Sequence, residues 1–564
     1  MKTEKQTHNN HDSNSTDNIA ADKLLRSAAK DVAAHEARMR EIILTLKKAA
    51  EGDTDLSIVG ERKLRSIAAH FDISTKNKET NTIAAELADK LLDDISRTEP
   101  GLCSTLSVVA PPERIQTWKQ LDLLPVSSSF EVSSALKQTS DESLNDWQKK
   151  MNTTFRLGAA FLLNCIAGSS LATDCLCGTA EHTTTKVYLE SLHADTVNIA
   201  LYEHIPTLAA AVCNATQNKR FTAMANEAGA TGIQVYEIRS SDKPSTDTVD
   251  NVFRLATTNG VGLALETGAI DVLLADTQKV LPKIASVAAF NKTVIVTTNK
   301  SSHLAGAEFI GTGNEVQTLA ENIVTRAIES FKNRRDVKRT LPGKDVTAQV
   351  GFSLDTIDRH YGCLDRIASA LIDGKIKGIV SLFGSTPTDA DSTQHLAVLI
   401  NTLLENNILI FANGYPAFSL ATQGFCSSKA REKCGEMLQL FLNTNMPPVW
   451  HFGECTDNAQ PLATFREVAK YAGHKMKDLP FAAVIPEWSE AEGLGATLAF
   501  RVSGFDTYHC TPPSLQQSKK IQDFLYNGTQ DQLGSSMHVA PNPNDLAEMI
   551  ISDFNNARSE LCWR

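Results

Sequence analysis

Cys455 is the residue of this chain whose type and place suggest chemistry most directly. It follows residues 449–452, an apolar run of β-branched and aromatic residues that predicts a buried strand, and Gly453 ends that run. Ligands of open α/β sheets bind at the carboxyl ends of the strands. The spacing therefore places the Cys455 thiol where a metal ligand or a nucleophile is expected.

A second group of possible metal ligands is Cys175 and Cys177, with His182 nearby. A single residue between two cysteines is a poor spacing for chelating one metal ion, so this group ranks below Cys455. The eleven cysteines are otherwise scattered and include no CxxC pair. An odd number of cysteines without an apolar N-terminal export segment favours reduced thiols and a cytoplasmic protein.

Composition excludes several classes of function. The 564 residues carry a formal net charge of −11, which argues against a nucleic-acid or anionic-membrane surface because both need a basic face. Hydrophobic residues (42%) and charged residues (21%) are in the ordinary range of globular proteins, and the length predicts several domains. No stretch approaches the apolar length of a membrane span, so none is expected.

The elements that must position Cys455 change type along the chain. Residues 1–20 are polar and predict a disordered tail. Residues 21–192 carry apolar side chains at helical spacing and predict an all-helical domain. Strand-like runs then alternate with helices, which predicts two Rossmann-like three-layer α/β/α domains over residues 193–335 and 336–564.

Within these two domains the predicted strands are short apolar runs. They cover residues 197–201, 232–236, 272–276, 293–297, 378–383, 408–411, 449–452 and 482–485. A helix is predicted near residues 249–258, and Asn542 is predicted to cap the last helix.

Several local strings, taken together in this order, resemble the catalytic subunit of anaerobic nickel–iron–sulfur carbon monoxide dehydrogenase, a family related to the hybrid-cluster proteins. The strings cover nearly the whole chain from about Asp22. They include Ala110-Pro111-Pro112-Glu113-Arg114-Ile115, Val197-Asn198-Ile199, Glu266-Thr267-Gly268-Ala269, His451-Phe452-Gly453-Glu454-Cys455-Thr456-Asp457-Asn458 and Pro486-Glu487-Trp488. The resemblance implies the helical and α/β fold described above, a homodimer, and clusters held by cysteines and one histidine.

Carried over position by position, the resemblance leaves few of the family's cluster ligands. His204 and Cys455 correspond to one histidine and one cysteine of the nickel–iron–sulfur cluster and are the remnant metal ligands. The other cysteine positions of the ancestral pocket hold Ser240, Lys279, Ser385 and Tyr415. The N-terminal cysteine cassette of the family should precede Leu24, where this chain has no cysteine.

The family's proton-transfer positions are also changed. Arg38 stands where the resemblance implies a proton-handling histidine, and His35 is kept one helical turn earlier. Glu492 stands where it implies a lysine.

A multi-iron cluster needs several soft anionic ligands, and one thiol with one imidazole is too few. The resemblance therefore implies a non-redox pseudoenzyme without the Ni–Fe–S and 4Fe–4S clusters, acting as a binding or partner protein, either as a homodimer or paired with an intact relative. A first alternative is an enzyme with a single zinc or iron, or a small ligand, held by His204, Cys455 and Glu492. A second is an oxidoreductase of the carbon monoxide dehydrogenase type.

Overall fold

The structure is a computed structural model of the whole chain. It describes the chain except residues 1, 55, 142–143, 203–205, 240–250, 276–282, 299–305, 312–314, 335–340, 361–363, 385–389, 454–456, 487–492, 514, 516–517 and 564. The side chains of residues 2–15 and of a few further helical residues are also outside the description.

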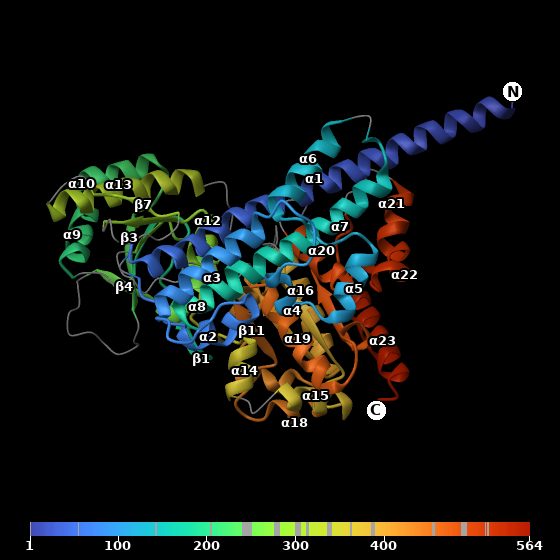
Figure 1. The fold of residues 1–564 in the computed structure, drawn as a ribbon. Coiled ribbons are helices and arrows are strands. Elements are labelled where there is room, and N and C mark those ends of the chain that lie inside the picture. The colour runs from blue at the N-terminus through green and yellow to red at the C-terminus, as the bar shows by residue number, and fades with distance from the viewer. Residues whose placement is uncertain are drawn as a thin grey trace.

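One long helix, α1 (Lys2–Glu51), is the axis of the N-terminal part (Figure 1). Its apolar side chains recur at helical spacing and are buried, among them Leu25, Val32 and Leu46. Three helices pack against it: α3 (Thr80–Ile95), α6 (Ser128–Ser140) and α7 (Trp147–Asn164). Shorter helices complete this part: α2 (Glu61–Ala68), α4 (Ser104–Val109) and α5 (Pro112–Gln120).

The start of α1 differs from the predicted disordered tail. The helix begins at Lys2, and Asp17 and Asn18 are 6% and 3% exposed. Ser518 Oγ donates a hydrogen bond of 2.8 Å to Asp17 Oδ1, so a distant segment holds this turn of the helix. The tail prediction was wrong for residues 17–20, because Ser518 bonds to Asp17 and Ala20 is buried in the core.

Helix α7 continues without a break through a π-helical segment, η3 (Cys165–Ala172), into α8 (Thr173–Cys177). The combined helix, Trp147–Cys177, is the one candidate among the described residues that is long and apolar enough to cross a membrane. The expectation that no stretch approaches that length was therefore wrong. Its most apolar window is 89% buried, and it packs against α1, α6 and α20 (Leu494–Val502), as a core helix does.

A single mixed sheet forms the rest of the core. Its order is β14-β13-β12-β9-β10-β11-β8-β1-β4-β3-β2-β5-β6-β7. The strands are β1 (Thr183–Val187), β2 (Val197–Tyr202), β3 (Ile233–Arg239), β4 (Val252–Thr257), β5 (Val272–Ala275), β6 (Val294–Thr297), β7 (Glu308–Phe309), β8 (Val346–Val350), β9 (Gly378–Leu382), β10 (Ile408–Asn413), β11 (Val449–Gly453), β12 (Phe481–Val484), β13 (Thr507–His509) and β14 (Met537–Val539).

The two expected α/β units share this sheet, and β1 is the seam between them. β1 pairs antiparallel with β8 on one side and with β4 on the other. The other pairs are parallel, as alternating strands and helices predict. The α/β class is thus confirmed at the level of a helix-rich protein with a large mixed sheet, and the division into two separate domains stays a prediction.

Helices cover both faces of the sheet. In the first half, α9 (Pro206–Thr216), α10 (Lys219–Glu227) and α13 (Val316–Arg334) bury one face in an apolar cluster of their own. The opposite face of this half carries α11 (Val261–Leu265) and α12 (Lys283–Phe290), which belong to the main core. Figure 1 shows α9, α10 and α13 on the outer side of this half and α12 between the sheet and α1.

In the second half, α15 (Leu364–Ile372) packs on α19 (Ala459–Ala472), and α16 (Ala390–Glu405) packs on α23 (Pro543–Glu560). The remaining helices are α14 (Leu354–His360), α17 (Gly414–Thr422), α18 (Glu436–Leu442), α21 (Lys519–Asp523) and α22 (Gln530–Leu533). The predicted cap of the last helix is confirmed, because Asn542 Oδ1 accepts a hydrogen bond of 2.8 Å from the Asn544 amide.

Buried polar groups hold the helical part onto the second half of the sheet. The last turn of α20 leaves backbone carbonyls without helical partners. Trp118 Nε1 donates to the Val502 carbonyl at 2.7 Å, and Arg114 Nη1 donates to the Leu533 carbonyl at 2.8 Å. Lys63 on α2 pairs with Asp355 on α14 at 2.8 Å. These contacts join segments several hundred residues apart.

The eight predicted strands all occur, with ends shifted by one to three residues. The prediction of a helix near residues 249–258 was wrong, because this segment forms β4 between β1 and β3. The Tyr188 amide donates to the Leu255 carbonyl at 2.7 Å, so the backbone of the segment is bonded across the seam.

Candidate functional site

The turn after β11 is bounded by a glycine that no other residue can replace without strain. Gly453 has a φ of +126°, in the region that favours glycine. A Cβ atom at this position would lie 2.2 Å from Asp457 Oδ2. The chain therefore brings Asp457 back against the end of the strand, across the segment that contains Cys455.

Buried hydrogen bonds fix the far side of this turn. Ser169 Oγ, on η3, donates to Asp457 Oδ1 at 2.6 Å. Asn413 Nδ2, at the end of β10, donates to Asn458 Oδ1 at 2.9 Å. All four side chains are at most 5% exposed. We call Gly453, Asp457, Asn458, Ser169 and Asn413 the β11 frame.

The π-helical segment connects this frame to helix α1. π-helical turns are rare and are common at functional sites. Besides Ser169, the segment carries Cys165, whose Sγ lies 3.5 Å from His35 Nε2 on α1. The ring of Phe161 lies against the His35 imidazole, with centroids 4.3 Å apart. The helices approach closely here, since a Cβ atom on Gly168 would lie 2.7 Å from the Met39 side chain.

His35 is a neutral imidazole at physiological pH. Burial, with a smaller contribution from the nearby charge of Arg38, lowers its pKa from 6.5 to about 3. Its Nδ1 is buried and has no hydrogen-bond partner among the described residues. A group with this pKa does not gain a proton near neutral pH, so it is poorly suited to general acid–base work there.

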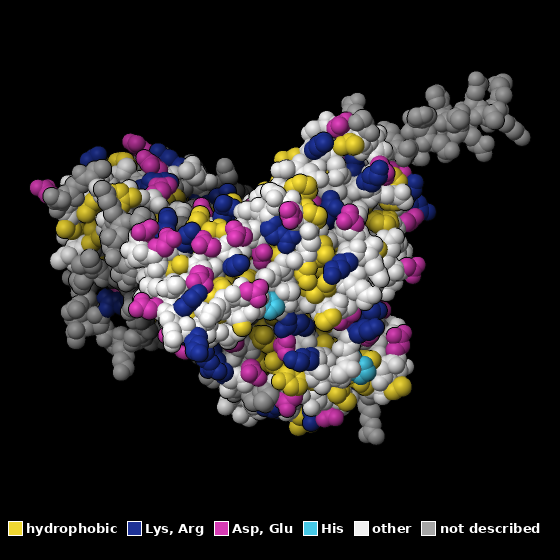
Figure 2. Space-filling view, viewed as in Figure 1, with side chains coloured by type: hydrophobic (Ala, Val, Ile, Leu, Met, Phe, Trp, Pro, Cys, Tyr) yellow, Lys and Arg dark blue, Asp and Glu magenta, His cyan; other side chains and the backbone are white. Residues whose placement is uncertain are grey.

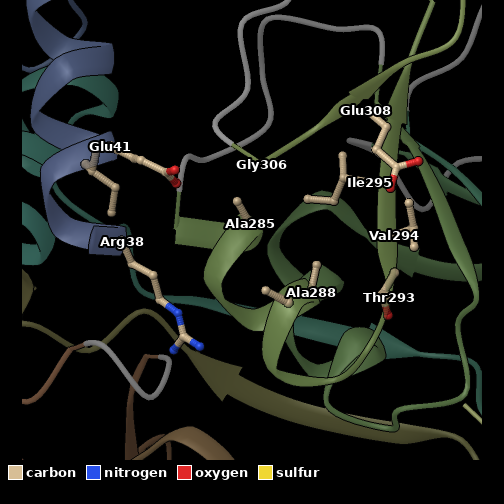
Figure 3. Close-up of a pocket in the computed structure, with 11 residues that line it drawn as sticks. Arg38, Glu41, Ala285, Ala288, Thr293, Val294, Ile295, Gly306 and Glu308 are labelled. Atoms are coloured by element: carbon tan, nitrogen blue, oxygen red, sulfur yellow. The ribbon is translucent and has the colours of Figure 1, made fainter. Parts of the chain in front are cut away.

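Arg38 lies one helical turn further along α1 and lines a cavity of about 200 Å³ between α1 and α12 (Figure 3). Its side chain is half-buried. Within the described part of the chain its guanidinium has no hydrogen bond and no ion pair. Arg38 is therefore a cation whose charge this part of the protein leaves uncompensated.

The remaining candidate residues divide into one that the structure describes and six that it does not. Tyr415 lies on α17 directly after β10, and its ring centroid is 5.7 Å from that of Phe418. Six residues lie outside the described residues: His204, Ser240, Lys279, Ser385, Cys455 and Glu492. Their roles stay predictions.

Chain order nevertheless gives these six residues a common relation to the sheet. Each comes within eight residues after a parallel strand: β2, β3, β5, β9, β11 and β12, respectively. The carboxyl ends of such strands are the usual ligand-binding edge. Their common role at this edge stays a prediction, and among the described candidates the structure brings together only His35 and Arg38, which share α1.

Most of the described thiols are buried, and Cys562 is exposed. Nine free cysteines are described, and burial raises the pKa of Cys103 and Cys434 to about 12 and that of Cys213 to about 11. A protonated thiol is a poor metal ligand. No group of three or more His, Cys, Asp or Glu side chains suited to a metal ion occurs among the described residues.

The second candidate group, Cys175, Cys177 and His182, is not brought together as a site. Burial raises the pKa of Cys175, and its carbonyl accepts a hydrogen bond of 3.0 Å from the Gly60 amide. His182 Nε2 lies 3.1 Å from Gln349 Oε1, and its ring packs on Phe352. These residues serve packing in the described structure.

Sequence reasoning missed Ser169, Asn413 and Cys165 as parts of the site. Asp457 and Asn458 lie in the segment 451–458 that carries the family resemblance, but the sequence alone predicted no role for them. Ser169 and Cys165 lie almost 300 residues earlier, in a run of small and apolar residues, and no local pattern distinguishes their contact partners. Their place depends on how α7 and η3 pack.

Comparison with known proteins identifies the family. The family model of the Prismane/CO dehydrogenase family matches residues 14–544. The chain is 29% identical to carbon monoxide dehydrogenase 1 of Methanosarcina acetivorans over 563 residues, covering 97% of this chain and 87% of the relative. It is 27% identical to carbon monoxide dehydrogenase 2 of Carboxydothermus hydrogenoformans, covering 92% of this chain and 83% of the relative.

Solved structures give the same relation. An as-isolated, Ni-free carbon monoxide dehydrogenase from Thermococcus sp. AM4 is 28% identical and superimposes with a TM-score of 0.72, covering 97% of this chain and 87% of that one. Carbon monoxide dehydrogenase IV from Carboxydothermus hydrogenoformans is also 28% identical, with a TM-score of 0.71, 97% of this chain and 89% of that one. The matches extend over the helical part and the whole sheet, and the chain belongs to the Prismane/CO dehydrogenase family.

Proposed function

We propose that this chain is a non-redox relative of the carbon monoxide dehydrogenases, a cytosolic binding or partner protein that does not carry their nickel–iron–sulfur chemistry. The observation that carries the proposal is the donor set. Where the resemblance places cluster ligands, the chain has only His204 and Cys455 as metal-binding donors, beside Ser240, Lys279, Ser385 and Tyr415.

This donor set does not fit an iron–sulfur cluster. Such clusters are held by several thiolates that converge on iron. Serine and tyrosine hydroxyls are hard donors that stay protonated near neutral pH, and the ammonium of Lys279 repels a metal cation. Burial raises the pKa of the Cys103, Cys213 and Cys434 thiols and keeps them protonated, so these three do not supply replacements.

The stability of the β11 frame also supports the proposal. Two buried hydrogen bonds join its side chains, from Ser169 to Asp457 and from Asn413 to Asn458. These bonds need no metal, so the scaffold around Cys455 has its own source of stability. The neutral His35 and the cationic Arg38 also suit a binding surface better than a proton relay.

Anaerobic production followed by metal analysis tests the proposal. The Thermococcus relative was obtained Ni-free when produced without the CooC maturase, so the chain should be produced with nickel and with that maturase. We expect iron and nickel far below one per chain and no reduction of a viologen dye by carbon monoxide. A carbon monoxide dehydrogenase made in the same cells is the positive control. A brown preparation that turns over carbon monoxide would overturn the proposal.

The same experiment separates a single-metal site from a metal-free protein. His204 and Cys455 both follow carboxyl ends of strands, which favours them as the ligands of one zinc or iron, with Glu492 as a third. This second candidate predicts one metal ion per chain that Cys455→Ser removes. Cys562→Ser, at an exposed thiol near the C-terminus, is the matched control and should leave the metal content unchanged.

We also propose that the chain associates, either as a homodimer or with an intact relative. Surfaces that pack subunits together can persist when a site has changed. Light scattering of the purified chain, alone and mixed with an intact carbon monoxide dehydrogenase, distinguishes the two. A monomer in both samples would contradict the idea.

A further inference from the structure

The cavity between α1 and α12 has walls of contrasting chemistry. Arg38, Glu41 and Ile42 line it from α1, and three alanines, Ala285, Ala288 and Ala289, line it from α12. Residues of β6 and β7, including Val294, Ile295 and Glu308, form the remaining wall (Figure 3). The cavity exists because α12 presents methyl groups toward α1 where larger side chains would fill the space.

Two of the three charged groups at this cavity lack a partner within the described structure. Glu308 is compensated, since Arg326 donates to both of its carboxylate oxygens at 2.6 Å and 2.7 Å. The Arg38 guanidinium and the Glu41 carboxylate have no such bonds among the described residues. They stand one turn apart on α1 and point in different directions (Figure 3). Because Glu41 is exposed to solvent, the charge that remains to be satisfied inside the cavity is the half-buried guanidinium of Arg38.

We propose that this cavity binds a small monocarboxylate with a short aliphatic body, its carboxylate on Arg38 and its chain against Ala285, Ala288 and Ile295. The proposal rests on the proposed function, because it names the ligand class of a non-redox binding protein. A planar carboxylate matches the guanidinium with two parallel hydrogen bonds. The alanine, valine and isoleucine walls offer only apolar contact to the rest of the molecule.

The volume of the cavity and the charges in its wall restrict the class of ligand. The volume of about 200 Å³ is below the usual range of roughly 300–1,000 Å³ for cofactor pockets, which excludes nucleotides and other large ligands. Glu41 at the wall disfavours a second negative charge, so a dianion such as phosphate should bind less well. The face in Figure 2 shows Lys and Arg interspersed with Asp and Glu and no broad basic surface.

Calorimetric titration of the full-length, metal-free protein with butyrate tests the proposal, with butylamine and inorganic phosphate as comparison ligands. We expect butyrate to bind at millimolar concentration and the other two to bind at least about tenfold more weakly. Arg38→Gln should weaken butyrate binding about 10- to 100-fold, because it removes both charged hydrogen bonds, and Arg38→Lys should lose less. Ala285→Leu should block the cavity.

Arg40→Gln is the matched control, since Arg40 lies on the same helix, is exposed, and bonds to Ser96 Oγ at 3.0 Å instead of lining the cavity. It should bind butyrate as the unmodified protein does. The proposal is overturned by any of three results: no butyrate binding, equal binding by Arg38→Gln and Arg40→Gln, or tighter binding of butylamine or phosphate. Finding a stoichiometric metal that Cys455→Ser removes, with butyrate binding intact, would overturn only the proposed function.

Discussion

The β11 frame and the cavity at Arg38 are opposite solutions to the problem of polar groups inside a protein. In the frame, the polar side chains are almost fully buried and are bonded across elements. At the cavity, the guanidinium of Arg38 is half-buried next to apolar walls and has no described partner. The arrangement in the β11 frame stabilises the fold, whereas the guanidinium at the cavity can still form hydrogen bonds and ion pairs.

This difference indicates which region stabilises the fold and which region has a charge left for the proposed ligand. A buried polar network is costly to disturb, because each broken bond leaves an unsatisfied group. An unpaired cation at a cavity can be changed with little cost to folding. The predictions below test that contrast by disturbing each region in turn.

The largest effect is expected for Gly453→Ala. The substitution forces a φ of +126° on a residue with a Cβ atom and drives that atom to 2.2 Å from Asp457 Oδ2. Strain and overpacking together should cost about 3–5 kcal/mol. The thermal midpoint of unfolding by circular dichroism measures the loss.

Gly473→Ala is the control for Gly453→Ala. Gly473 also has a positive φ, +73°, at the C-terminus of α19, but nothing lies within 4 Å of a Cβ atom there. It should lose only about 1 kcal/mol. Equal losses in the two variants would show that the contact with Asp457 does not matter.

Ser169→Ala is expected to cost about 2–3 kcal/mol. It removes the 2.6 Å hydrogen bond to the buried Asp457 side chain and leaves that acceptor with one donor fewer. Ser66→Ala, at an exposed position on α2, should change stability by less than about 0.5 kcal/mol. The two midpoints measured side by side decide whether η3 supports the β11 frame.

Acidification should destabilise the protein partly through His35. Its pKa is about 3 in the folded chain and near 6.5 when unfolded, so below about pH 6.5 the unfolded state binds more protons. The contribution of His35 to the free energy of unfolding is complete above that pH. It falls by about 2 kcal/mol between about pH 7 and about pH 5.

His35→Phe should remove this part of the pH dependence while keeping the ring contact with Phe161. A residual dependence is expected from His509, whose pKa burial also lowers to about 3. If His35→Phe lost as much stability between neutral and acid pH as the unmodified protein does, the assignment of the effect to His35 would be contradicted.

The smallest effect is expected for Arg38→Gln, within about 0.5 kcal/mol of the unmodified protein. No described bond is lost, so folding should be insensitive to a change that weakens butyrate binding. Arg334→Gln provides the contrast, because Arg334 pairs with the buried Asp271 at 2.7 Å and 3.1 Å. Its loss should cost about 3–5 kcal/mol. A large loss in Arg38→Gln would mean that Arg38 has a structural role.

Much of the fold could be predicted from local sequence. The strands around residues 199, 380 and 450 are short apolar runs between turn residues, and the structure places each of them beside parallel partners in the sheet. Asn542 capped the last helix as its side chain predicts. β4 could not be recognised in this way, because Val252, Phe253, Leu255 and Ala256 fit a helical face as well as a strand. Its pairing with β1 and β3 decides the matter.

The candidate site was also predictable only in part from the sequence. The sequence by itself indicated the family, which the comparisons confirm, and the glycine that ends β11, and it predicted His204 and Cys455 as possible metal ligands. Only the tertiary structure decided that Ser169 bonds Asp457, that His35 is buried beside Cys165, and that Arg38 faces a cavity without a partner. The physical reason is range: propensity and spacing act over a few residues, whereas burial and charge compensation depend on side chains that meet only when α1, η3 and the sheet pack together.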